Sequence, residues 1–214
     1  DHDERIILVQ NQRNMGAAYN YNQVLELSSG EYFKWMAADD VIHSRFIASA
    51  VEVLDANPMI LLTYTKAGYI DESDHVLSFF DEKLKLSPWP RAAVPRAKQM
   101  IQALLANHGV ANVVIFGLFR TDALRSIRPL GNYYGSDLTL VSELALLGEI
   151  YEIPDVFSFY RQHAASSSTY ELPLGVSPRK SAASSKLKRP SAVSQQVFFD
   201  PSINGRFRQE VQLR

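Results

Sequence analysis

The chain has 214 residues, of which 46% are hydrophobic, and this is enough to bury one sizeable core and leave a tail. Its formal net charge of −1 argues against a general attraction to nucleic acid or to an anionic membrane. The absence of cysteine excludes disulfides and thiolate metal sites, and it fits a reducing compartment. No apolar run reaches the roughly 18 residues of a membrane span, so we expect no transmembrane segment.

The first 40 residues predict a strand, a helix and a second strand. Residues 6–9 form a continuous apolar run that is typical of a buried strand. A polar turn over 11–16 leads into a helical pattern over 17–27, and Gly30 is expected to end that helix in a left-handed conformation. Because short connections favour parallel packing, the next strand is expected to be parallel to the first. Residues 1–5 lead at once into a strand, so we expect the sequence to be a fragment that lacks an earlier part.

An apolar and aromatic run over residues 30–38 ends on two adjacent carboxylates, Asp39 and Asp40. As a strand, this run would carry both acids to the edge where open α/β sheets bind ligands. Two carboxylates there can hold Mg²⁺ or Mn²⁺, which take oxygen ligands and commonly share them with substrate phosphates. The alternative is that the pair only begins a turn or caps the next helix.

The rest of the folded part is expected to alternate helices and strands. Its first half predicts a helix over 45–54 capped by Ser44 and ended at Asn57-Pro58, a buried strand over 59–64, a hairpin from 68–71 and 75–79, and a helix over 96–105. Its second half predicts a strand over 112–119, a short helix capped by Thr121 and running through Ile127, a helix over 137–147 capped by Ser136 and ended by Gly148, and strands over 150–153 and 156–160.

The composition changes near residue 165. Residues 166–196 are rich in Ser, Pro, Lys and Arg. This predicts a folded domain over 1–165 and an extended or partly disordered tail over 166–214. Residues 196–201 interrupt the tail with an apolar run, which we expect to dock back on the domain or to begin a helical extension.

The turn before the first helix offers a candidate anion site. Asn14 and Gly16 are followed by Asn20 and Asn22 on the helix. Glycine permits close approach of the backbone, and the first turn of a helix presents free N–H groups to an anion. A simple polar turn between strand and helix is the alternative.

Three later residues could also serve a site. Asp137, at a helix start, is either a carboxylate stabilised by the helix dipole or a general base for a hydroxyl. Arg161 follows the last core strand as a phosphate partner or a surface charge. His163, two residues later, is a metal ligand or a surface histidine.

The order and spacing of these groups resemble a known family. The series is Asn14-x-Gly16, Asn22, Gly30-Glu31-Tyr32, Asp39-Asp40, Ser136-Asp137, Gly148 and Arg161-x-His163. It is similar to the family 2 nucleotide-sugar glycosyltransferases of the GT-A fold, over roughly residues 5–168. The resemblance implies an α/β domain with a Rossmann-like, mixed and mostly parallel sheet flanked by helices, here without the family's N-terminal strands.

The resemblance also implies a role for each group. In such enzymes strand-end acids, the DxD motif, bind Mn²⁺ or Mg²⁺, which bridges the donor's diphosphate. By position Asp39 is similar to the metal ligand that ends this motif, while Ala37 stands where the earlier acid is usual. His163 matches a position that completes the metal site or the diphosphate site, and we expect it to be a metal ligand. Asp137 is similar to the catalytic base, although Ser136 replaces the Glu that usually precedes it. The residues expected to bind the nucleotide sugar are Asn14, Gly16, Asn22, Asp40 and Arg161.

The expected function is therefore metal-assisted transfer of a sugar, with inversion, from a nucleotide-diphosphate sugar to an acceptor hydroxyl. The acceptor is open between a glycan, a lipid and another hydroxyl compound, and no nucleic-acid partner is expected. We expect a cytoplasmic protein, or one peripheral at the inner face of the membrane. The rival interpretation, favoured by the absent front strands, is a non-catalytic GT-A-like remnant that acts as a binding or scaffold module. A nucleotidyltransferase is a weaker rival, because the Gly-rich phosphate loop expected near its start is not visible.

Overall fold

The computed structural model describes residues 5–80, 88–106, 113–163, 197–202 and 206–211. The strands are β1 (Ile6–Leu8), β2 (Tyr32–Phe33), β3 (Val41–Ile42), β4 (Ile60–Ile70), β5 (Val76–Phe79), β6 (Leu118–Arg120), β7 (Glu149–Arg161), β8 (Val197–Ser202) and β9 (Arg206–Val211). The helices are α1 (Ala17–Leu27), α2 (Phe46–Ala56), α3 (Ala93–Ala106), α5 (Thr121–Arg125) and α6 (Ser136–Leu147). None of the helices within the described ranges is both long and apolar enough to cross a membrane.

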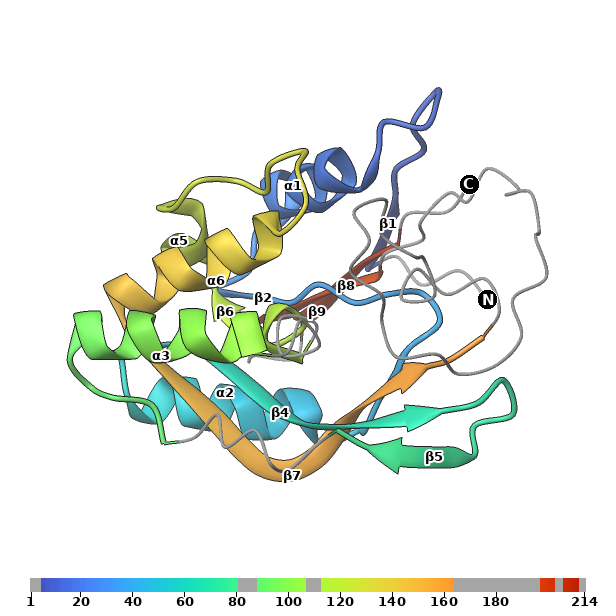
Figure 1. Ribbon diagram of the computed structural model, residues 1–214. Helices are drawn as coiled ribbons and strands as arrows, with labels where there is room; N and C mark the ends of the chain where they lie inside the picture. Colours follow the sequence, from blue (N-terminus) through green and yellow to red (C-terminus); the bar gives the residue numbers. More distant parts are fainter. Residues whose placement is uncertain (1–4, 81–87, 107–112, 164–196, 203–205, 212–214) are drawn as a thin grey trace.

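The central sheet is mixed and has the strand order β2-β6-β4-β7-β3, with β5 paired to β4 (Figure 1). The two long strands β4 and β7 run parallel, from Ile60 beside Glu149 to Ile70 beside Arg161. The other pairings described in this sheet are antiparallel. The mixed, GT-A-like α/β sheet is thus confirmed, but its parallel part is confined to β4 and β7.

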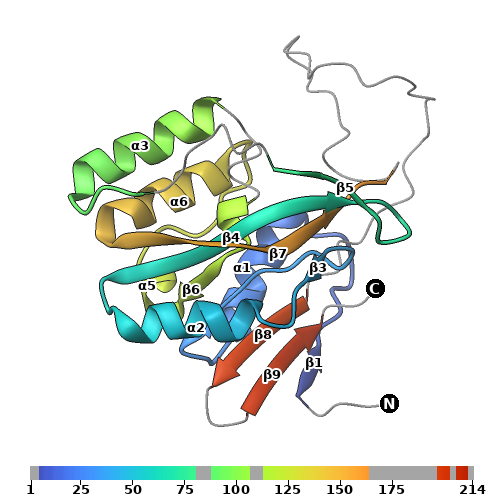
Figure 2. The same ribbon diagram turned by 90° about the horizontal axis from the view of Figure 1, so that it is seen from below.

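Helices cover both faces of this sheet and create two hydrophobic clusters. In Figure 2, α3 and α6 lie on one side of β4 and β7, and α2 lies on the other. The larger cluster gathers apolar side chains of α1, α3 and α6 around the fully buried Trp35. The smaller cluster packs Phe46, Ala50 and Leu54 of α2 against the opposite face. Burial on both faces explains why apolar residues dominate β4, in which Thr63 and Thr65 are also buried.

The first strand differs from the prediction. β1 was expected to be buried and to pair in parallel with the strand after α1, yet Ile7 and Leu8 are exposed. β1 instead pairs in parallel with β9, in a separate three-stranded sheet with the order β1-β9-β8. An apolar run indicates that a segment favours a strand, but the identity of its partner is set by distant residues.

The strand expected to end at the two acids is also shorter than predicted. β2 covers Tyr32–Phe33, because its partner β6 has only three residues and the hydrogen-bonded ladder ends with it. The chain then passes through the core at Trp35 and turns at Asp39 and Asp40 before β3. The two acids therefore lie on a turn between short strands rather than at the end of a long strand. For the backbone, this agrees with the alternative that the pair begins a turn.

The predicted helix caps are wrong in detail. α2 begins at Phe46, and the N–H of Phe46 donates to the backbone carbonyl of His43 at 2.9 Å. The predicted cap Ser44 is therefore not used. α5 includes Thr121, whose Oγ1 is buried without a hydrogen-bond partner among the described residues. α6 begins at Ser136 and is preceded by Gly135 in the left-handed region, with φ of 81°. Gly30, expected to be left-handed, is not among the described glycines with positive φ.

Two strand predictions also changed. Residues 113–115, expected in a strand over 112–119, are helical, because an apolar run without periodicity fits either state; residue 112 lies outside the described residues. The strands expected over 150–153 and 156–160 are one strand, β7. Its register with β4 shifts where Pro154 and Asp155 are inserted, and such an irregularity accommodates a residue that has no N–H to donate.

The tail is described only in part. Residues 164–196, on which the prediction of an extended or disordered segment falls, lie outside the described residues. β8 and β9 form an antiparallel hairpin from Val197 beside Val211 to Ser202 beside Arg206. The helical alternative for the apolar run at 196–201 is therefore wrong, and the pairing of β9 with β1 shows how the tail docks.

Candidate functional site

The two acids and two later polar residues meet at the end of β7. The turn of Asp39 and Asp40 leads into β3, which pairs antiparallel with the last part of β7. The backbone N–H of Arg161 donates to Oδ1 of Asp40 at 3.0 Å. Nε2 of His163 lies 2.8 Å from Oδ2 of Asp39. Four of the predicted site residues, from two parts of the chain about 120 positions apart, are thus in direct contact; we call them the acid cluster.

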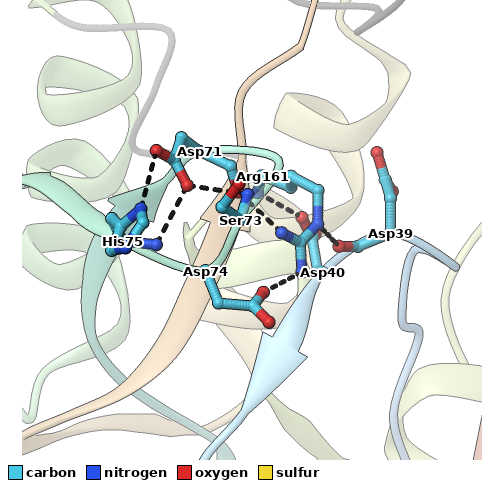
Figure 3. A network of polar contacts seen from close by, with 7 residues as sticks. All are labelled: Asp39, Asp40, Asp71, Ser73, Asp74, His75 and Arg161. Carbon is cyan, nitrogen blue, oxygen red and sulfur yellow. Dashed lines mark hydrogen bonds and ion pairs between the residues drawn. The ribbon is translucent and has the colours of Figure 1, made fainter.

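The guanidinium of Arg161 is bound to protein groups (Figure 3). Nε donates to the carbonyl of Asp39 at 2.8 Å, and one terminal nitrogen donates to the carbonyl of Asp71 at 2.6 Å. The other terminal nitrogen forms an ion pair of 2.5 Å with Asp74. Arg161 therefore cross-links the turn of the acids to the β4–β5 hairpin. The sequence predicted a phosphate partner or a surface charge at this position, and not this structural role.

The turn of that hairpin is held by Asp71 (Figure 3). Its Oδ1 accepts the backbone N–H of Ser73 at 2.8 Å and of His75 at 2.9 Å. These two bonds, with a smaller contribution from the His75 side chain, lower the pKa of Asp71. Asp74 adopts a φ of 68°, which Asp tolerates better than most residues. The hairpin turn thus reaches Arg161 in one defined conformation.

Burial changes the electrostatics beside the acids. Desolvation raises the pKa of Asp40 to about 6, and neighbouring Asp39 adds to this, although the N–H of Arg161 opposes it. Lys34, which is only 1% exposed, has its pKa lowered to about 7 by burial, while Asp40 raises that value. Because Lys34 is buried and Asp40 is half-buried, the Lys34 ammonium and the Asp40 carboxylate each favour the charged form of the other.

Lys34 is a residue that the sequence interpretation missed. Its Nζ donates to the carbonyl of Phe116 and lies 4.5 Å from the centre of the Phe46 ring. Together with Asp40, Phe116 and Tyr160 it lines a cavity of about 10 Å³ behind the acids. The available signal was a lysine in the middle of an apolar strand, since a fully buried lysine needs a partner.

Asn14 and Gly16 lie at the start of α1 in an open position. The Oδ1 of Asn14 accepts the N–H of Gly16 at 2.9 Å, so this N–H already has a partner. Gly16 has a φ of 87°, and a Cβ there would meet no atom within 4 Å. Glycine is therefore favoured at this exposed turn by the positive φ rather than by lack of space for a side chain. Whether this turn binds an anion stays a prediction.

Asn22 positions a loop. Its Nδ2 donates to the carbonyl of Leu130 at 2.8 Å, and its Oδ1 accepts the N–H of Leu130 at 2.9 Å. This paired contact spans 108 positions of the sequence and fixes the loop over residues 130–135 to α1. Both ends of the Asn22 amide are engaged by the protein, so its expected contact with a nucleotide sugar has no support in this geometry.

Asp137 lines an open cavity. This cavity has a volume of about 410 Å³ and is bordered by the start of α1, the loop over 130–135 and the start of α6. Asp137 stands in the first turn of α6, where the helix dipole stabilises a carboxylate. Phe116 lines both this cavity and the small one beside Asp40. Asp40 and Asp137 thus line two cavities that have the side chain of Phe116 in common.

Residues 1–127 match the family model for glycosyl transferase family 2, which is more than half of the chain. The chain belongs to glycosyl transferase family 2. It is also 30% identical, over 84 residues, to a protein of Methanocaldococcus jannaschii that is named an uncharacterized glycosyltransferase. That match covers 39% of this chain and 29% of the length of the relative. For this family 2 chain, the family match contains Asp39 and Asp40, whereas Asp137, Arg161 and His163 lie beyond it.

The donors present in this family 2 chain fit a metal ion that is shared with a substrate. Oδ2 of Asp39 and Nε2 of His163 lie side by side, and both side chains are partly exposed, at 43% and 23%. Within the described part of the chain, no group of three or more His, Cys, Asp or Glu side chains could enclose an ion by itself. Mg²⁺ commonly uses one or two protein ligands together with substrate phosphates, and this is the arrangement that two exposed donors allow.

Proposed function

We propose that this chain transfers a sugar from a nucleotide-diphosphate sugar to an acceptor hydroxyl, with inversion at the anomeric carbon and with the help of Mn²⁺ or Mg²⁺. The observation that carries the proposal is the contact between Asp39 and His163 at 2.8 Å, beside an Asp40 that is bonded to Arg161. These groups are distant in sequence, and they converge within a chain of glycosyl transferase family 2.

The acid cluster would bind the donor. Asp39 and His163 would hold the divalent ion, which neutralises charge on the leaving diphosphate when it is bound. Asp40 is kept beside them by the N–H of Arg161, and the guanidinium of Arg161 fixes the backbone at Asp39. Arg161 therefore supports donor binding by positioning the turn of the acids, since the described protein groups already occupy its guanidinium.

Asp137 would act on the acceptor. Its carboxylate borders a cavity large enough for part of a small ligand, and it can accept the proton of a hydroxyl placed there. The acceptor oxygen then forms a bond to the anomeric carbon, and the bond from that carbon to the diphosphate oxygen breaks on the opposite side. The nucleoside diphosphate leaves with the electron pair of that bond, and a single displacement of this kind inverts the centre.

Donor binding tests the proposal. A panel of nucleotide-diphosphate sugars is titrated by calorimetry into the chain with Mn²⁺ and with EDTA. We expect binding of at least one donor that needs Mn²⁺ and that is lost in Asp39→Ala. Asp155→Ala, which removes an exposed carboxylate elsewhere on β7, is the matched control and should bind as the unchanged chain does.

The same measurement, extended to turnover, distinguishes the transferase from the rival interpretation of a non-catalytic module. A non-catalytic module would bind donors without turnover, so each bound donor is also incubated with acceptors and the product is analysed by NMR. A product with inverted anomeric configuration supports the transferase. Binding that is unchanged in Asp39→Ala would contradict the metal assignment, and absence of donor binding would contradict the proposed reaction.

A further inference from the structure

The cavity beside Asp137 is lined by aromatic rings at its rim. Tyr133 and Tyr134 are 58% and 68% exposed, which is unusual for such large rings. Both line the cavity, together with Tyr21, Phe116 and the polar side chain of Asn132. A concave site with several rings and a few polar groups suits a ligand with a flat apolar face and hydroxyls at its edge.

The loop that carries the two tyrosines is held in place. Asn22 fixes its beginning through the two hydrogen bonds to Leu130. At Gly131 a Cβ would lie 2.1 Å from a ring carbon of Tyr133, so a larger residue would displace this ring from its present position. Gly135 ends the loop with a φ of 81°. The rings are therefore presented by a loop whose two ends are fixed, and this reduces the entropy that a ligand must overcome.

The charge of the residues that line the cavity disfavours an anionic acceptor group. Among the described residues that line it, none carries a cationic side chain, and Asp137 is an acid. A phosphate group would bring a charge of about −1.5 to −2 next to Asp137 without a positive partner. A neutral hydroxyl compound meets no such repulsion.

We propose that this cavity binds a neutral pyranose ring, stacked on Tyr133 or Tyr134, and that the acceptor of the reaction is a hydroxyl of this sugar. The inference rests on the proposed function and deepens it, because it selects a carbohydrate over a lipid phosphate as the acceptor group. The pyranose can belong to a free glycan or to a lipid-linked sugar, since both present the same ring to the tyrosines.

Ligand-observed NMR tests the site without knowledge of the donor. Saturation transfer is measured for methyl pyranosides of the gluco, galacto and manno series and for methyl phosphate. We expect at least one pyranoside to bind through its ring protons, and methyl phosphate to show no transfer. The double variant Tyr133→Ala/Tyr134→Ala should weaken pyranoside binding about 3- to 10-fold, whereas Tyr133→Phe/Tyr134→Phe should stay within about 2-fold. Tyr151→Ala, an exposed tyrosine of β7, is the control and should have no effect.

A second experiment distinguishes lipid-linked sugars from free sugars as ligands of the cavity. The best pyranoside is compared, as a competitor, with a soluble oligosaccharide and with a glycolipid in detergent micelles. If the cavity binds free and lipid-linked sugars alike, both competitors should displace the pyranoside.

The outcomes distinguish the two proposals. Pyranoside binding without donor binding in calorimetry would overturn the proposed transferase reaction. Donor binding without pyranoside binding would overturn the sugar site. Pyranoside binding that persists in the double alanine variant would also overturn it, as would stronger binding of methyl phosphate than of every pyranoside. Because both tyrosines are exposed, their replacement should leave the fold intact, which circular dichroism of each variant checks.

Discussion

The acid cluster and the cavity at Asp137 are built in different ways. In the acid cluster, hydrogen bonds and an ion pair join three chain segments: the turn of Asp39 and Asp40, the end of β7 with His163, and the β4–β5 hairpin. The cavity at Asp137 is open and lined by rings, and Asn22 anchors the beginning of its loop. Under the proposed function, the donor side is fixed in advance, whereas the acceptor side leaves space for a ligand.

The largest expected effect concerns the cavity. Asp137→Asn keeps the size of the side chain but removes the base, so transfer should fall by about 10²- to 10⁴-fold. Donor binding should stay within about 2-fold, because Asp137 does not belong to the acid cluster. Turnover is measured as release of nucleoside diphosphate and binding by calorimetry. A variant that loses donor binding and turnover together would show that the two regions are not separate.

The next largest effect concerns the cross-link at Arg161. Arg161→Ala removes charge-assisted bonds from a side chain that is only 17% exposed, so the free energy of unfolding should fall by about 2 kcal/mol. Urea denaturation followed by circular dichroism measures it. Arg13→Ala, an exposed arginine, is the matched control and should change it by less than about 0.5 kcal/mol. Equal stability of both variants would contradict the view that the donor side is fixed by this residue.

A pH effect is expected from Lys34. Its pKa is about 7 in the folded chain and near 10.5 when exposed, so the unfolded chain binds more protons between these values. The free energy of unfolding should therefore rise with pH from about 7 towards 9, by at most roughly 1.4 kcal/mol per unit from this group. Lys34→Met should abolish that slope.

The matched control for this experiment is Lys98→Met, which removes an exposed lysine of α3 and should keep the slope of the unchanged chain. The measurement stays below pH 9, where only about a tenth of the tyrosines of the unfolded chain, with an ordinary pKa of about 10, are ionised. An identical pH dependence in Lys34→Met and in the unchanged chain would mean that the ammonium is accessible to water in solution.

The smallest effect is expected at Asp74. Its carboxylate is 71% exposed, and an exposed ion pair contributes at most about 1 kcal/mol. Asp74→Asn retains a residue that tolerates positive φ, so the free energy of unfolding should change by less than about 1 kcal/mol and donor affinity by about 2-fold. Thermal unfolding and calorimetry measure both. A loss as large as that of Arg161→Ala would show that the hairpin, rather than Arg161, fixes the acids.

The elements that could be predicted were those with a strong local pattern. The helix over 17–27 was confirmed at both ends, and the hairpin around residues 71–75 was found where polar turn residues separate two apolar segments. The apolar run near residue 115 was misassigned, because an unpatterned run fits a helix and a strand equally well. The length of β2 also could not be predicted, since it depends on where β6 ends.

The candidate site was predictable as a set of residues and less so as a set of contacts. Asp39, Asp40, Arg161 and His163 were all named from the sequence, and they meet. Asn22 was named too, but its amide holds the loop at Leu130. Lys34 was missed, because its charge made it resemble a surface residue in an otherwise apolar strand.

The sequence by itself determined which segments are apolar, where the turns fall and which side chains have chemistry suited to a glycosyltransferase of family 2. The tertiary structure decided that the Arg161 guanidinium is bound by protein groups, that Lys34 is buried against Phe116, and that Phe116 lines both the small cavity at Asp40 and the cavity at Asp137. Hydrophobic patterns act over a few neighbouring residues, whereas hydrogen-bond partners depend on the register between strands that lie far apart in the chain.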